Sequence, residues 1–113
     1  MKIIRKEEQA RLGVLKAKAE AGDAEAQAKV GDMYLFSVGV DAADCEIAHK
    51  WYKKSAEQNC AEGIAKLAYL YELGYGKDGE IILRSDKAKA RELYEKAAAM
   101  GNEFAINHLA KMK

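Results

Sequence analysis

The sequence predicts an all-α fold, a short right-handed α-α superhelix of about six antiparallel helices. Three observations predict it. The 113 residues include no proline and half of them are apolar, while much of the rest is lysine and glutamate, which favour helices. Apolar residues recur at helical spacing. A stretch of about forty residues occurs twice, and a period of this length is typical of stacked helical units that bury their apolar faces against each other.

The repetition is clearest between residues 24–34 (AEAQAKVGDMY) and residues 61–71 (AEGIAKLAYLY), where five of the eleven aligned positions are identical. Farther along the chain, residues 44–59 align with residues 86–101, but at a shift of 42 positions instead of 37. The loop inside the second unit is therefore expected to be five residues longer than the loop inside the first.

The chain is expected to be a single domain, residues 1–113, with two full repeats at about 24–60 and 61–102. Half-repeats at 4–22 and 103–113 flank them. Each repeat is predicted to contain two helices and each half-repeat one. The expected helices cover residues 4–20, 24–36, 44–57, 61–73, 86–99 and 103–112.

The first helix of each repeat carries one apolar stripe. In the first repeat the stripe consists of Ala26, Val30, Gly31 and Tyr34, at steps of four, one and three residues. A small residue in the middle of the stripe should let a partner helix approach closely, while the tyrosine fills the wider gap one turn later. The second helix should pack on both neighbouring first helices through a face that carries Ala48, Trp51, Tyr52 and Ser55.

Residues that typically begin and end helices support these boundaries. Asp44 and Asp86 stand where the second helices should begin, and their side chains can accept hydrogen bonds from unpaired backbone N–H groups. Gly39, Gly74 and Gly76 stand where the first helices should end, because glycine adopts left-handed backbone angles at little cost. The two helices of a repeat should therefore form an antiparallel hairpin.

Charge and apolar patterning exclude several partners. A net charge of +1 gives no electrostatic basis for binding nucleic acid or an acidic membrane. No apolar run is long enough to span a bilayer or to form the core of a signal peptide. A cytoplasmic location is therefore expected, and the alternative is a leader removed from a longer precursor.

No catalytic residue, cofactor or metal ligand is expected, so the protein is not predicted to be an enzyme. His49 and His108 fall on different kinds of helix with no nucleophile between them, and both are interpreted as surface or rim residues. No cysteine or histidine spacing is typical of a metal site. The glycine-rich run at residues 74–79 (GYGKDG) should close a helix rather than follow a strand, so we interpret it as a turn.

Each of the two repeats follows one pattern of residues. It reads A-x-x-x-L-G-x-x-Y-x-x-G-x-G-V and then D-x-x-x-A-x-x-W-Y-x-K-A-A-x-x-G. On this basis residues 14–112 resemble the Sel1-like repeat (SLR) family, which is related to the tetratricopeptide repeats. The first copy carries the phrase in Ala26, Val30, Gly31, Tyr34, Gly39, Val40, Asp44, Ala48, Trp51, Tyr52, Lys54 and Ala56. Three positions depart from it, since Ser37 replaces a loop glycine, Asn59 the closing glycine and Leu93 the tryptophan.

The longer loop, residues 77–85, is a larger departure from the family pattern. It contains Ile81, Ile82 and Leu83 in succession, and three apolar residues in a surface loop require cover. One interpretation is that they pack over the adjacent helix ends. The other is that the loop is a flap that contacts a partner.

The resemblance implies a non-catalytic scaffold or adaptor that binds a peptide or protein partner in a concave groove. The alternative is a small inhibitor or immunity-type protein that binds and neutralises a single partner. Mapped from the tetratricopeptide relatives, the groove should be lined by Glu25, Asp32, Leu35, Phe36, Glu62, Tyr69, Glu72, Phe104, Asn107 and Lys111.

Aromatic rings bordered by carboxylates would suit a basic peptide with apolar anchors. The competing interpretation is that Phe36 and Phe104 cover the core between helices, while the carboxylates only keep the surface soluble. A monomer is expected, with a dimer through the apolar side of the C-terminal helix as the alternative.

Overall fold

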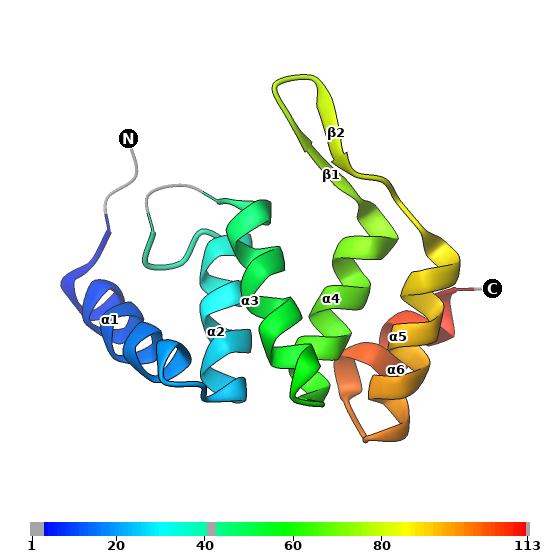
Figure 1. Cartoon of the computed structure of the whole chain (residues 1–113), viewed down its shortest axis with the longest axis horizontal. Helices are drawn as coiled ribbons and strands as arrows, with labels where there is room; N and C mark the ends of the chain where they lie inside the picture. Colours follow the sequence, from blue (N-terminus) through cyan, green and yellow to red (C-terminus); the bar gives the residue numbers. More distant parts are fainter. Residues whose placement is uncertain (1–3, 41–42, 113) are drawn as a thin grey trace.

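The computed structural model describes residues 4–40 and 43–112, and this part of the chain forms six helices and one β-hairpin (Figure 1). The elements are α1 (Lys6–Glu20), α2 (Ala24–Leu35), α3 (Cys45–Glu57), α4 (Ala61–Leu73), β1 (Tyr75–Lys77), β2 (Glu80–Leu83), α5 (Lys87–Ala99) and α6 (Glu103–Lys111). Each helix packs mainly on the next one along the chain. The predicted all-helical stack is thereby confirmed, and the helix bounds differ from the expected ones by at most two residues.

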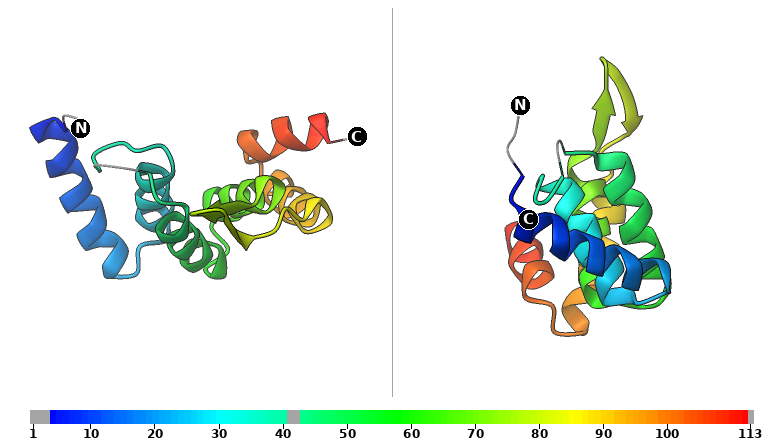
Figure 2. Two further views of the ribbon diagram at one scale, coloured as in Figure 1. Left: turned by 90° about the horizontal axis from the view of Figure 1, so that it is seen from above. Right: turned by 90° about the vertical axis from the view of Figure 1, so that its left-hand side faces the viewer.

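The helices form an arc with a hollow side. α2, α3, α4 and α5 make up the middle of the arc, and α1 and α6 lie at its ends (Figure 2). The N-terminal half of α1 and the whole of α6 rise on the same side of the middle layer (Figure 2). α2 also contacts α4 directly, so the first helices of the two repeats are adjacent.

The two repeats have the same local geometry where a first helix passes to a second. The backbone carbonyl of Tyr34 accepts a 2.9 Å hydrogen bond from the N–H of Asp44, and the carbonyl of Tyr71 accepts a 2.7 Å bond from the N–H of Asp86. Both aspartates then cap the helix that follows, through side chains that accept from the N–H of Ile47 and of Lys89. Tyr34 and Tyr71 therefore occupy equivalent places.

The turns after α1, α3 and α5 also match. Gly22, Asn59 and Gly101 all have positive φ, at 104°, 58° and 87°. Asparagine tolerates the left-handed region better than most residues, which explains why Asn59 can replace glycine here. Ser37 likewise has a φ of 58° after α2, at the place that Gly74 occupies after α4.

The close approach predicted at Gly31 is present. The ring of Tyr52, which is fully buried on α3, lies over Gly31 on α2, and an added Cβ there would be 2.5 Å from the ring carbon Cε1. At the equivalent position in α4, Ala68 is fully buried in one cluster with Tyr94 of α5. The small residue in the stripe therefore determines how closely the two helices of a repeat pack.

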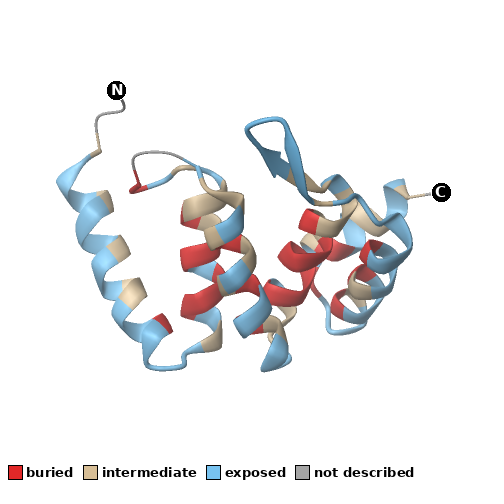
Figure 3. Cartoon of the chain, turned by 45° about the horizontal axis from the view of Figure 1, so that its top comes forward, coloured by how far each residue is buried: buried red, intermediate tan, exposed pale blue. Residues whose placement is uncertain are grey.

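The core runs through the stack as three adjoining clusters of buried residues, concentrated on α2 to α5 (Figure 3). Tyr34 packs against the first and second clusters from the N-terminus, and Tyr71 packs against the second and third. Each tyrosine therefore joins one repeat unit to the next. No buried side-chain nitrogen or oxygen among the described residues lacks a hydrogen-bond partner.

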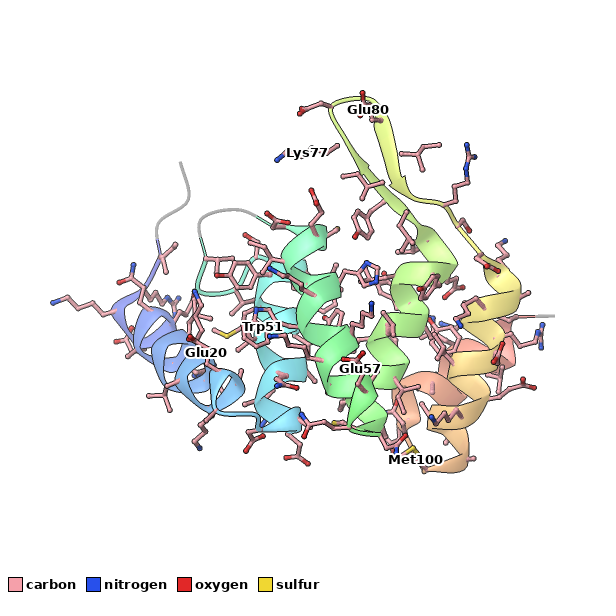
Figure 4. The ribbon with its side chains drawn as sticks, viewed as in Figure 1. Glu20, Trp51, Glu57, Lys77, Glu80 and Met100 are labelled. Atoms are coloured by element: carbon pink, nitrogen blue, oxygen red, sulfur yellow. The ribbon has the colours of Figure 1, made fainter. Side chains whose placement is uncertain are left out.

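The prediction for residues 77–85 was wrong in one respect, because this segment belongs to a β-hairpin rather than a loop. Asp78 and Gly79 both have positive φ, which is the conformation of a two-residue turn between antiparallel strands. Of the three apolar residues only Leu83 packs on the helices, whereas Ile81 and Ile82 are 64% and 45% exposed. The hairpin extends away from the helical body, with Glu80 next to the turn at its tip (Figure 4).

Candidate protein-binding surface

Lys66 is at the centre of the hollow side. Its ammonium group lies 2.8 Å from Oδ1 of Asp32 on α2 and 3.6 Å from Oε2 of Glu62 on its own helix, α4. It also lies 5.0 Å from the ring centre of Phe104 on α6 and 5.8 Å from that of Phe36, within the range of a cation–π contact. Although lysine is seldom buried, Lys66 is only 8% exposed, because these partners compensate its charge.

Asp32 joins three helices through one carboxylate oxygen. Besides Lys66, this oxygen accepts a 2.6 Å hydrogen bond from the hydroxyl of Tyr52 on α3. Burial, with the negative charge of Asp32 next in importance, raises the pKa of Tyr52 and keeps its hydroxyl protonated. The carboxylate therefore has a structural role and is not an unpaired charge on the surface.

The α6 end of the surface is built in a similar way. The hydroxyl of Tyr94 on α5 donates a 2.8 Å hydrogen bond to Oε1 of Glu72, and Nδ1 of His108 lies 3.4 Å from the same oxygen. The His108 ring stacks on Phe104 with ring centres 4.2 Å apart, and Tyr69 meets Phe104 edge-on at 5.5 Å. Five residues of three helices thus hold α6 against α4.

Six of the ten groove residues predicted from the sequence form this connected cluster: Asp32, Phe36, Glu62, Tyr69, Glu72 and Phe104. The other four do not. Leu35 packs into the core beneath, since α2 ends at this residue with its side chain directed toward α3 and α4. Glu25, Asn107 and Lys111 are exposed, and Lys111 lines a separate hollow between α5 and α6.

Three of the four predicted groove carboxylates have partners within the protein. Asp32 pairs with Lys66, Glu72 accepts from Tyr94, and Glu62 accepts a 2.8 Å hydrogen bond from the side-chain amide of Asn102. Sequence reasoning missed the donors. One feature of the sequence pointed to donors at this surface, since Lys66 and His108 occupy the same column of the repeat alignment. The alignment does not show which carboxylates they contact, because those partners include residues of other helices.

A groove lies beside this cluster, between α1 and α2. It has a volume of about 780 Å³, and Asp32 forms part of its wall. Its apolar lining is Ala10, Val14, Leu15, Met33 and Val38, and its polar lining also includes Glu7, Arg11 and Lys29. Val14 is 59% exposed and Val38 is 38% exposed, so the groove presents aliphatic surface to water. The sequence prediction did not include the wall formed by α1.

Replacing Lys66 with methionine is expected to lower the free energy of unfolding by about 1–3 kcal/mol, because Asp32 and Glu62 would lose their shared cation. Lys29→Met is the matched control, since Lys29 is the repeat equivalent of Lys66, is exposed and has no ion pair among the described residues. Its effect should stay within about 0.5 kcal/mol. Chemical denaturation monitored by circular dichroism measures both, and equal effects would contradict the assigned role of Lys66.

Alkaline pH should destabilise the protein through its two core tyrosines. Burial raises the pKa of Tyr52 and of Tyr94 above the ordinary value of 10.0. Their stabilising contribution is therefore complete below pH 10 and is lost as the pH rises further, because only the unfolded chain releases these protons easily. The decline in unfolding free energy from pH 9 to pH 11 should be smaller in the Tyr52→Phe, Tyr94→Phe double variant, and an identical decline would contradict this explanation.

The fold and the surface define a class of protein, a helical-repeat solenoid with a hollow face and an apolar groove. The chain belongs to the Sel1 repeat family, whose sequence pattern matches residues 24–60 and 61–102. Sel1 repeats typically mediate protein–protein interactions. No described helix combines the length and apolar character needed to cross a bilayer, and no cluster of three metal-ligating side chains occurs in the described residues.

Three similar proteins are each longer than the chain. An uncharacterised Sel1-like repeat-containing protein of Schizosaccharomyces pombe is 31% identical over 87 residues, which cover 76% of this chain and 12% of the yeast protein. A crystal structure of a Sel1 repeat protein from Oxalobacter formigenes has a TM-score of 0.75 at 30% identity and covers 89% of this chain and 38% of that protein.

A third similar protein is cysteine rich protein B of Helicobacter pylori, with a TM-score of 0.72 at 25% identity, covering 89% of this chain and 71% of that one. The chain thus spans about an eighth of the yeast relative and less than half of the Oxalobacter protein. These similarities establish the fold and the family.

Proposed function

We propose that this protein is a non-catalytic interaction module that binds a segment of a partner protein on its hollow side, in the α1–α2 groove. The observation that carries the proposal is the groove itself, a hollow of about 780 Å³ with an exposed aliphatic lining and charged residues at its edge. Exposed apolar surface of this kind is costly in water and is typical of a binding site.

The remaining chemistry of the hollow side supports binding rather than catalysis. Two carboxylates of the hollow side are engaged in contacts between helices, Asp32 with Lys66 and Glu72 with Tyr94. His108 is stacked on Phe104, and His49, on α3, has Nδ1 2.8 Å from the hydroxyl of Tyr75. Neither histidine has a serine or cysteine among these contacts that it could activate.

The experiment compares three exposed aliphatic residues at three candidate surfaces. Val14 lies in the groove, Ile81 on the hairpin and Ile106 on α6, and they are 59%, 64% and 46% exposed. The tagged protein and its Val14→Glu, Ile81→Glu and Ile106→Glu variants are cross-linked to bound proteins in an extract of the host cell. Circular dichroism of each variant checks that the fold is retained.

The proposal predicts that Val14→Glu abolishes the cross-linked product while the other two variants retain it. Loss in Ile81→Glu alone would instead identify the hairpin as the contact surface. Loss in Ile106→Glu alone would place the contact on the C-terminal helix. Either result would contradict binding in the α1–α2 groove.

A further inference from the structure

The α1–α2 groove occupies a position that a helix fills elsewhere in the same molecule. α1 leads into α2 through Gly22 as α3 leads into α4 through Asn59, and both turn residues have positive φ at the same place in the repeat. α3 is packed between two first helices, α2 and α4. Among the described helices, α1 packs mainly on α2, and its Glu8 side chain also accepts a hydrogen bond from the N–H of Gly39 in the segment after α2.

The α2 wall of the groove lacks a contact that the equivalent residues of α4 make with the preceding first helix. In the repeat alignment Lys29 and Met33 of α2 correspond to Lys66 and Leu70 of α4. Lys66 binds Asp32 of the preceding first helix, and Leu70 is buried in a cluster that includes residues of α2. Met33 lines the groove but is already buried, at 6% exposed, whereas Lys29 is exposed and has no carboxylate within ion-pair distance in the described part of the chain.

The α1 wall agrees with this assignment. Leu15 corresponds to Tyr52, which packs over Gly31 of its first helix, and Arg11 corresponds to Ala48. α3 buries three of its residues between its two neighbours, whereas Ala19 is the one buried residue of α1, which is mostly exposed (Figure 3). The face of α1 that would receive a first helix is thus present, and no described helix other than α2 covers much of α1.

We infer that the groove binds an amphipathic, acidic helix of a partner protein, which lies where the first helix of a preceding repeat would lie. The inference rests on the proposed function and adds the chemistry of the partner. The helix presents an apolar stripe with a small residue toward Leu15, and a carboxylate beside that residue reaches Lys29 as Asp32 reaches Lys66. Apart from Asp32, which pairs with Lys66, the charged lining residues are the cations Arg11 and Lys29 and the single anion Glu7, so a second carboxylate of the helix is favoured beside Arg11.

A second copy of this chain does not supply such a helix. Its terminal first helix, α6, carries Ala110 and Lys111 at the positions of Gly31 and Asp32. Lys111 would therefore face Lys29 with the same charge, which disfavours this pairing. α2 has the required glycine and aspartate, but in the folded protein it is already packed against α3 and α4.

A peptide with the sequence of α2 therefore serves as the probe. Residues 23–36 are synthesised with blocked ends and with a lactam between Glu25 and Lys29, four residues apart, because isolated short helices are unstable in water. It is titrated into the ¹⁵N-labelled protein, its Lys29→Glu variant and its Lys96→Glu variant, an exposed control on α5. A second peptide carries Asp32→Lys.

We expect the first peptide to shift amide resonances along the groove, around Ala10, Val14 and Met33. Lys29→Glu should weaken its binding about five- to tenfold, Lys96→Glu should not, and the Asp32→Lys peptide should regain affinity for the Lys29→Glu protein.

Shifts on another surface, no shifts at millimolar peptide, or equal affinity for wild type and Lys29→Glu would overturn the inference. So would concentration-dependent shifts on α6 without peptide, which would indicate self-association. If the peptide fails while Val14→Glu still abolishes partner capture, the proposed function stands and only the acidic helix is wrong.

Discussion

Replacing Tyr52 with alanine is expected to lower the free energy of unfolding by about 3–5 kcal/mol, which is much of the stability of a small domain. The ring is fully buried between the two first helices, and its hydroxyl donates to Asp32. The alanine variant loses the buried ring and leaves a cavity in the contact between repeats. Urea denaturation of the variant and the wild type measures the difference.

Two further variants separate the contribution of the Tyr52 ring from that of its hydroxyl and compare the two repeats. Tyr52→Phe keeps the ring and should cost only about 1–2 kcal/mol, because Asp32 retains Lys66 as a partner. Tyr94→Ala, at the equivalent position of the second repeat, should cost about as much as Tyr52→Ala, because Tyr94 is equally buried and donates to Glu72. A cost below about 1 kcal/mol for Tyr52→Ala would mean that the two repeats do not depend on this contact.

Gly31→Ala and Gly13→Ala are expected to change stability in opposite directions. A Cβ at Gly31 would meet the ring of Tyr52, so this variant should lose about 1–3 kcal/mol. A Cβ at Gly13 in α1 would have no atom within 4 Å, and alanine should stabilise this helix by about 0.5–1 kcal/mol. Thermal unfolding of both variants and the wild type measures the direction of each change in stability. A Gly31→Ala protein as stable as the wild type would contradict the close packing of Tyr52 on Gly31.

The two repeats differ at this position for a structural reason. The hydroxyl of Tyr52 is bound by Asp32, the residue next to Gly31, so the ring is held across the glycine. The hydroxyl of Tyr94 is bound by Glu72, which is one helical turn beyond Ala68. The second repeat therefore has room for the alanine methyl group, and the first repeat requires glycine.

Helical spacing and capping residues were sufficient to predict the stack. The stripe through Ala26, Val30 and Tyr34 fixed which face of α2 is buried, and Asp44 and Asp86 fixed where the second helices begin. These features act within one helix or between helices adjacent in the chain. For this reason they are visible in the sequence without any knowledge of the fold.

The hairpin could have been predicted but was not. Asp78-Gly79 between short runs of strand-forming residues is a strong signal for a two-residue turn. In the family pattern this segment is a loop, and that pattern alone does not predict strands. As a result, the exposure of Ile81 and Ile82 was not anticipated.

The site was less predictable than the fold, because its contacts join distant parts of the chain. Lys66 and Asp32 are 34 residues apart, and Asn102 and Glu62 are 40 apart. Whether a carboxylate has a partner depends on whether a side chain of another helix extends far enough to contact it. The alignment of the two repeats does not contain this information. The groove likewise depends on how the described helices pack, since α3 lies between two first helices and α1 packs mainly on one, α2.

The most direct test of the account is the stability of the fragment comprising residues 1–60, which retains α1, α2 and α3 and lacks α4. The account predicts a weakly helical fragment without a cooperative thermal transition, because Ala48 and Tyr52 lose their contacts with Leu67 and Leu70. Far-UV circular dichroism measures the helix content and the thermal unfolding of the fragment, and both are compared with those of the full chain. A fragment that keeps the helix content expected for its length and unfolds cooperatively would show that the repeats do not complete each other's cores.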